Sequence, residues 1–157
     1  MENASKYLSL TIEMAQDNVK RGRGGPFAAL IVRNGQILAA TANSVTSSND
    51  PTAHAEVNAI REACRKLNTF QLDDCELYTS CEPCPMCLGA IYWARIRKVY
   101  YAATQDEAAA AGFDDSFIYQ EIGKPHLDRN IPFVHVKIEN ANAPFRVWNE
   151  SENKIAY

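Results

Sequence analysis

The fold of this chain is decided by residues 54–102, which read HAEVNAIREACRKLNTFQLDDCELYTSCEPCPMCLGAIYWARIRKVYYA. Apolar residues recur at helical spacing over 54–67 and again over 84–95. Each of these stretches is followed by a short apolar one, at 75–79 and at 98–102. Such periods predict a helix, a strand, a helix and a strand in turn. This alternation is typical of α/β domains, in which helices cover a central sheet.

The residues before this stretch predict one more helix and a hairpin. Residues 5–21 carry apolar side chains at helical spacing, and the glycine-rich stretch 22–26 ends that helix. Two apolar stretches follow, at 27–32 and 36–42, and the dipeptide Asn34-Gly35 separates them. Asn-Gly between two apolar stretches is the strongest short-range signal for a tight hairpin. An antiparallel pair at this point makes the predicted sheet mixed.

Three further segments complete the expected fold. The polar stretch 43–52 predicts a loop that leads to the helix at 54. Residues 132–138 alternate apolar and polar side chains, which predicts a fifth strand at an edge, and 144–152 predicts a short terminal helix. We therefore expect a three-layer α/β/α fold with a five-stranded mixed sheet. The length favours a single domain over residues 1–157.

Composition narrows the class of protein. Of the 157 residues, 46% are hydrophobic and 22% are charged, which is usual for a globular protein. The formal net charge is −3, whereas a nucleic-acid-binding protein normally carries a basic surface, so no nucleic-acid partner is expected. The sequence offers no membrane span or signal peptide, so no membrane partner is expected. Five cysteines, an odd number, favour a reduced, cytoplasmic protein.

One imidazole and two thiols have the spacing of a metal site. Cys84 and Cys87 are three residues apart at the predicted start of a helix, where the first turn brings both sulfurs toward one point. With His54 they supply the donor types that zinc prefers, and three protein ligands leave one position for water. Glu56 follows His54 by two residues. We expect it beside the bound water, as a proton carrier, and not on the metal.

Other interpretations of these residues remain open. The Cys84–Cys87 pair is also the spacing of a redox-active dithiol. Cys81 lies three residues before Cys84, so a closed structural zinc site with four protein ligands is conceivable. The chain is then a noncatalytic binding module stabilised by zinc. Such a module has no use for Glu56, and the presence of this residue beside His54 favours catalysis.

The pattern H-x-E followed by P-C-x-x-C is the signature of the zinc nucleobase deaminases. Together with GGPFAALIV, NDPTAHAEVNAIREAC and AGFDDSF, it makes the chain resemble the bacterial guanine deaminases from about residue 5 to the end. The resemblance implies a cytidine-deaminase-like fold and the hydrolysis of guanine, a small purine, to xanthine and ammonia. It also implies one zinc ion per chain and a homodimer.

The resemblance further assigns residues to the substrate. Glu56 would be the proton shuttle and Asp115, of the pair Asp114-Asp115, a second acid–base group. Tyr157 would close the site, from its own chain or from a neighbour. The other implied substrate contacts are Asn43, Phe27, Ala55, Trp93 and Asp114. Deamination of guanosine or of another small nucleobase or nucleoside remains an alternative, as does that of adenosine in tRNA, which the acidic charge and the DDSFIY segment disfavour.

Overall fold

The computed structural model describes residues 2–157, which separate into two compact units. One unit ends at Ser116 and the other spans Phe117–Tyr157. The prediction of a single domain over the whole chain is not tested by this division and stays a prediction. Among the described helices, none is both long and apolar enough to cross a membrane.

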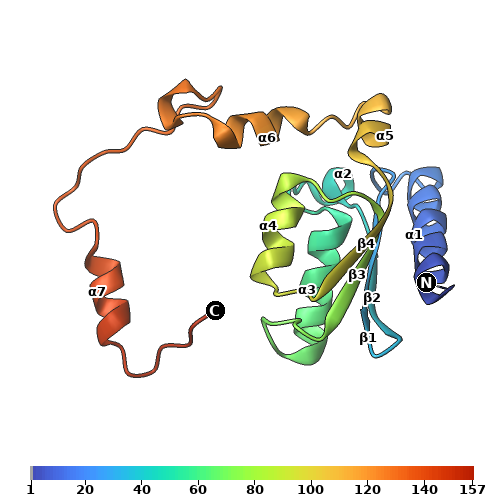
Figure 1. The fold of residues 1–157 in the computed structure, drawn as a ribbon, viewed down its shortest axis with the longest axis horizontal. Coiled ribbons are helices and arrows are strands. Elements are labelled where there is room, and N and C mark those ends of the chain that lie inside the picture. The colour runs from blue at the N-terminus through green and yellow to red at the C-terminus, as the bar shows by residue number, and fades with distance from the viewer. Residues whose placement is uncertain (1) are drawn as a thin grey trace. The chain divides into compact units, whose positions relative to one another are not determined.

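The first unit contains a mixed sheet between helices (Figure 1). Within the described residues the sheet has four strands in the order β2-β1-β3-β4. Strand β1 pairs antiparallel with both β2 and β3, and β3 pairs parallel with β4. The elements of this unit, in chain order, are α1 (Glu2–Lys20), β1 (Ala28–Arg33), β2 (Gln36–Ala42), α2 (Val45–Ser48), α3 (Ala55–Leu67), β3 (Cys75–Cys81), α4 (Pro85–Trp93), β4 (Lys98–Ala103) and α5 (Gln105–Ala110).

The predicted hairpin is confirmed. Arg33 pairs with Gln36, so the connection is two residues long, and both of these residues, Asn34 and Gly35, have positive φ angles of 50° and 76°. Positive φ at both central positions is what a tight hairpin turn of matching twist requires, and Asn-Gly adopts it at little cost. A short helix, α2, lies inside the stretch that was expected to be a loop.

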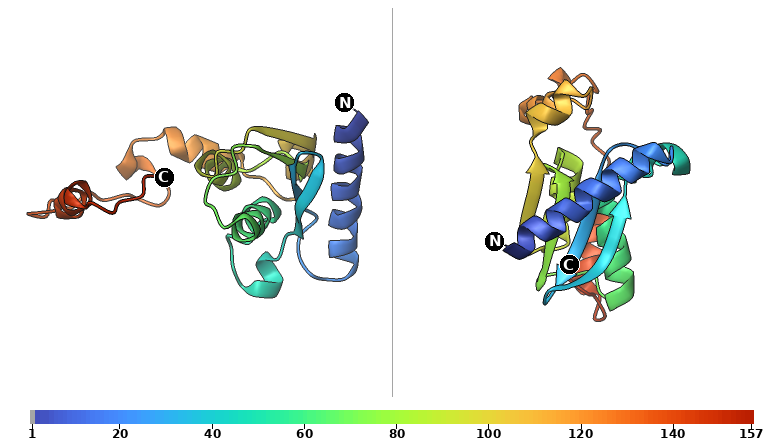
Figure 2. Two further views of the ribbon diagram at one scale, coloured as in Figure 1. Left: turned by 90° about the horizontal axis from the view of Figure 1, so that it is seen from below. Right: turned by 90° about the vertical axis from the view of Figure 1, so that its right-hand side faces the viewer.

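Three layers are confirmed, and β1 lies at their centre. Its residues alternate between the two faces: Ala29 and Ile31 belong to one apolar cluster, Leu30 and Val32 to the other. The first cluster lies against α3 and α4, and the second against α1. Figure 2 shows α1 on one side of the sheet and the two other helices on the opposite side. Burying a side chain of the size of Leu30, Ile31 or Val32 stabilises the fold by about 1.5–3 kcal/mol.

The second unit corrects one prediction. Its elements are α6 (Ser116–Gly123), a 3₁₀ helix (His126–Asp128) and α7 (Ala143–Glu150). Residues 132–138 belong to no strand, so the expectation of a five-stranded sheet was wrong for the described chain. Alternating side chains fit a strand only where a neighbouring strand accepts the backbone hydrogen bonds. No described strand pairs with this segment, and its apolar side chains are exposed.

Several strands begin or end at the same end of the sheet. The parallel strands β3 and β4 end there, as does β2, and β1 begins there. Two hydrogen bonds connect neighbouring strands at this end of the sheet. Ala28 N–H donates to Ser80 Oγ at 3.0 Å, and Glu82 N–H, just after β3, donates to the carbonyl of Ala103 at 2.8 Å. Helices α3 and α4 start at the same edge, so their N-termini face one region.

Candidate active site

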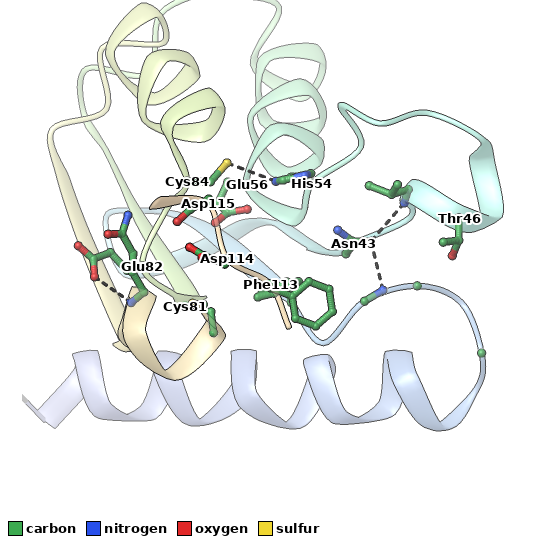
Figure 3. A pocket seen from close by; sticks show the side chains of 17 residues that line it. Asn43, Thr46, His54, Glu56, Cys81, Glu82, Cys84, Phe113, Asp114 and Asp115 are labelled. Carbon is green, nitrogen blue, oxygen red and sulfur yellow. Dashed lines mark hydrogen bonds between the residues drawn. The ribbon is translucent and has the colours of Figure 1, made fainter. Parts of the chain in front are cut away.

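The three predicted metal ligands meet at the starts of two helices. His54 is the N-cap residue of α3, Cys84 is the N-cap residue of α4, and Cys87 lies in the first turn of α4. His54 Nδ1 lies 3.5 Å from the Sγ atom of each cysteine, as Figure 3 draws for Cys84. Tetrahedral zinc, with bonds of about 2.3 Å to sulfur and about 2.0 Å to nitrogen, separates such donors by about 3.5 Å. The group therefore fits zinc.

The surroundings of the thiols favour a bound cation. A hydrogen bond from Cys87, with a further one involving His54, lowers the pKa of Cys84 to about 4. The same bond, together with burial, raises the pKa of Cys87. Hydrogen bonding to Cys84 also raises the pKa of His54. The N-terminus of α4 adds partial positive charge that stabilises a thiolate. A lowered pKa of the Cys84 thiol suits a metal ligand, because the thiolate is the form that binds a metal.

Cys81 does not join this group. Among the described residues, the ligand atoms that lie within 4.8 Å of one another belong to His54, Cys84 and Cys87. The Cys81 thiol instead lies 3.7 Å from the carbonyl oxygen of Thr104. The geometry therefore disfavours the closed structural site with four protein ligands and leaves one coordination position for water.

Glu56 lies beside the ligands without being one of them. It is the second residue of α3 and only 5% exposed. Its Oε1 accepts a hydrogen bond of 3.2 Å from Thr79, and its Oε2 accepts one of 3.5 Å from the Cys87 thiol. Burial raises the pKa of its carboxyl group. A raised pKa makes a carboxylate a better proton acceptor, which suits a general acid–base group.

A cavity of about 660 Å³ opens onto His54 and Glu56 (Figure 3). Its walls include the rings of Phe27 and Phe113, whose centroids are 5.0 Å apart in an edge-to-face arrangement. Phe27 is a substrate contact implied by the resemblance, whereas no motif in the sequence predicts Phe113 or Glu82 in the cavity wall. The other lining residues are Gly22, Gly24, Gly25, Asn43, Val45, Thr46, Cys81, Glu82, Cys84, Gln105, Ala108, Asp114 and Asp115.

The side-chain oxygen of Asn43 already accepts hydrogen bonds from the backbone. Its Oδ1 accepts hydrogen bonds from the backbone N–H groups of Gly25 and Val45, both at 3.2 Å (Figure 3). Two backbone donors fix the orientation of the amide, since a flipped side chain would turn its NH₂ group toward them. The NH₂ group therefore remains to donate a hydrogen bond to a ligand in the cavity.

The two adjacent aspartates line the cavity, but their surroundings shift their pKa values in opposite directions. Asp114 Oδ1 accepts a 2.9 Å hydrogen bond from Ser116 N–H. Hydrogen bonding to the side chain and then to the backbone of Ser116 lowers the pKa of Asp114. Burial, and then the negative charge of Cys84, raise the pKa of Asp115. Asp114 thus has the contacts of a turn residue, whereas Asp115 has the environment of a proton carrier.

Two predicted substrate contacts of the first unit, Trp93 and Ala55, do not line this cavity, and a third, Tyr157, lies in the second unit. Trp93 is the last residue of α4 and 68% exposed. Ala55 is fully buried, and its carbonyl oxygen accepts a 2.8 Å hydrogen bond from Thr41 Oγ1. Tyr157 belongs to the second unit and is 71% exposed. The roles assigned to these residues stay predictions.

Comparison with known proteins agrees with this geometry. The model of the cytidine and deoxycytidylate deaminase zinc-binding region matches residues 1–103. The chain belongs to this family. The resemblance inferred from the motifs is thereby confirmed, and so is the cytidine-deaminase-like fold apart from the fifth strand.

Individual relatives span different shares of the chain. Guanine deaminase of Bacillus subtilis (strain 168) is 57% identical over 99% of both chains, and its crystal structure superposes with a TM-score of 0.96 over 98% of each. A tRNA-specific adenosine deaminase of Aquifex aeolicus is 35% identical over 87% of both chains. A variant protein solved in complex with 8-azaguanine is 38% identical, with a TM-score of 0.68 over 71% of this chain and 65% of its own.

Proposed function

We propose that this protein is a zinc-dependent guanine deaminase, which hydrolyses guanine to xanthine and ammonia. The observation that carries the proposal is the His54–Cys84–Cys87 group with Glu56 at the end of a cavity large enough for a purine. The choice of guanine rests on the full-length similarity to a guanine deaminase, whereas the tRNA-specific relative matches a smaller share at lower identity.

Each residue of the cavity has a different role in the proposed reaction. Zinc, when bound to its three ligands, supplies a water of lowered pKa. Glu56 holds the proton removed from that water and passes it to N3 of the purine, while the oxygen adds to C2. The remaining hydroxyl proton would then pass through Glu56, with help from Asp115, to the 2-amino group. The C2–N bond would break to release ammonia, and the C2 carbonyl of xanthine would remain. The NH₂ group of Asn43 donates to an acceptor of the base, and Phe27 with Phe113 forms an apolar wall.

Asp115 is the proposed second proton carrier. We expect Asp115→Asn to lower kcat by roughly a hundredfold, because general acid–base catalysis is typically worth about 10²–10⁴-fold. Asp114→Asn keeps an oxygen that accepts from Ser116 N–H, so its kcat should change by no more than a few-fold. Steady-state kinetics on both variants decides between them. A larger loss in Asp114→Asn means that the roles of the two carboxylates are reversed.

The conversion itself is tested on the purified, zinc-loaded protein. Guanine should disappear as xanthine and ammonia form in equal amounts, the purines followed by chromatography and the ammonia by a coupled assay. The matched control is the same protein with adenine, whose amino group lies on a different carbon. Ammonia release from adenine, or from adenosine in a tRNA anticodon stem, without xanthine formation from guanine would contradict the proposal.

The C-terminal tail is proposed to select the free base over the nucleoside. Tyr157 ends a tail that is largely polar, and an aromatic ring placed over the site would exclude water and crowd a ribose on N9. We expect deletion of residues 153–157 to lower guanine turnover while zinc content and thermal stability stay unchanged. Kinetics with guanine and guanosine measures the effect. An unchanged kcat and KM for guanine would refute this role.

We also propose that the protein forms a homodimer. The unit Phe117–Tyr157 exposes many large apolar side chains, and exposed apolar patches often mark protein–protein interfaces. Its exposed apolar residues include Ile131, Phe133, Val136, Ile138, Phe145 and Val147. Sedimentation should give a mass of twice 17.5 kDa at micromolar concentration. A mass of 17.5 kDa under those conditions would contradict the proposal.

A cytoplasmic location and one deaminase domain per chain complete the proposal. The structure describes all five cysteines and places none of them in a disulfide, which suits a reducing compartment. Fractionation of cells that express the tagged protein is expected to recover it with cytoplasmic markers. Limited proteolysis of the dimer should leave residues 1–157 intact if they act as one domain.

A further inference from the structure

Asn18 is a buried polar residue that the reaction scheme does not use. It lies near the end of α1 and is 5% exposed. Its side-chain NH₂ group donates two hydrogen bonds of 2.9 Å, one to the carbonyl oxygen of Gly25 and one to that of Asn43. Both acceptors belong to residues that line the cavity. A single buried amide therefore joins two walls of the site.

The two parts of the cavity wall that Asn18 joins, around Gly25 and around Asn43, are packed too closely to move independently. A Cβ atom placed on Gly24 would lie 2.2 Å from the carbonyl oxygen of Asn43. The loop of residues 22–26, here called the glycine loop, therefore packs directly against Asn43, the residue that follows β2. Gly25 N–H in turn donates to Asn43 Oδ1, and Asn43 N–H donates to the carbonyl of Phe27 at 2.9 Å. Asn43 is thus fixed by hydrogen bonds of both its backbone and its side chain, and Asn18 donates to its backbone carbonyl.

We propose that Asn18 is a positioning residue, which sets the direction in which Asn43 presents its NH₂ group to the base. The inference rests on the proposed function, in which Asn43 binds the purine. Removing the Asn18 amide leaves the carbonyls of Gly25 and Asn43 without this donor, in a region where buried acceptors need partners. The glycine loop and Asn43 then relax together, and a displacement of about 1 Å is enough to cost binding or rate about 100-fold.

A second buried polar residue of the same helix provides a matched control. Thr11 is fully buried on α1, and its Oγ1 donates a 2.7 Å hydrogen bond to the carbonyl of Leu8, within the helix itself. Thr11→Val removes a buried hydrogen bond from α1 without touching the glycine loop or Asn43. It should lower the melting temperature and leave the KM for guanine unchanged.

The test is a double-mutant cycle on the zinc-loaded protein, with Asn18→Ala, Asn43→Ala and the double variant. We expect Asn18→Ala to raise the KM for guanine roughly tenfold, with zinc content unchanged. In the Asn43→Ala background, Asn18→Ala should raise the KM for guanine by less than about twofold, because the side chain through which Asn18 acts is absent. Asn18→Ser, which keeps one hydroxyl donor, should give an intermediate KM and replaces Asn18→Ala if that variant does not fold.

Two results would overturn the inference. One is an Asn18→Ala or Asn18→Ser variant that melts at a lower temperature, as Thr11→Val does, but keeps its KM within twofold of the wild type. The other is a cycle in which Asn18→Ala raises the KM by the same factor in the wild type and in the Asn43→Ala variant. The same cycle run on the Kd of 8-azaguanine by calorimetry does not depend on turnover. If the wild type binds 8-azaguanine but forms no xanthine, the proposed function fails and the positioning role is still decided.

Discussion

Replacing Glu56 with glutamine is expected to lower kcat for guanine by at least about 10²–10⁴-fold, the usual range for the loss of a general acid–base. Glutamine keeps the shape of the side chain, and its amide oxygen still accepts the hydrogen bond from Thr79. It does not accept a proton from the attacking water, and it has none to give to the leaving amine. Because Glu56 is not a metal ligand, the zinc content should stay at about one per chain.

The matched control for this variant lies on the same helix. Glu62 pairs with Lys66 on the surface of α3, away from the cavity, so Glu62→Gln should keep full turnover. Steady-state kinetics and metal analysis are measured on both variants and on the wild type. Near-normal turnover in a zinc-loaded Glu56→Gln protein would show that another group carries the proton.

Removing the metal is expected to abolish turnover. Without zinc the attacking water keeps the pKa of about 15.7 of bulk water, against about 7 for a zinc-bound one, so hydroxide is almost absent at neutral pH. Dialysis against a chelator should reduce activity at least a thousandfold, in proportion to zinc content, and added Zn²⁺ should restore it. Because zinc binds the folded chain, its removal should also lower the melting temperature.

A pair of cysteine variants separates the metal from other roles of the thiols. Cys87→Ala should lose both zinc and activity, whereas Cys64→Ala, which changes a half-buried thiol packed against the core, should keep both. Full activity in protein whose zinc has been removed, or in Cys87→Ala, would mean that the reaction does not use this site. Activity that depends on reductant instead of zinc would favour the dithiol interpretation.

Much of the first unit could be predicted because its signals are local. Apolar spacing gives α1, α3 and α4, and Asn34-Gly35 gives the hairpin within a few residues of sequence. The metal group could also be predicted, although His54 and Cys84 are thirty positions apart. The reason is chemical, since few combinations of residues suit zinc and the two short motifs supply one such set.

The remaining features depend on contacts that short patterns do not encode. Residues 132–138 alternate like a strand, yet whether they form one depends on a partner strand elsewhere. Phe113 becomes part of the cavity only because its ring meets Phe27, far away in sequence. Asn18 belongs to no motif, and its hydrogen bonds to Gly25 and Asn43 form only when folding brings these residues together.

The most direct test of the central claim is the comparison of kcat/KM for guanine, guanosine, cytosine, cytidine and adenine on one zinc-loaded preparation. Ammonia release reports all five reactions in the same units. We predict that guanine exceeds every other compound by at least about 100-fold, since a site that hydrogen-bonds its substrate strongly rejects analogues that leave its polar groups unpaired. An equal or higher value for cytidine, guanosine or adenine would contradict the assignment of guanine as the substrate.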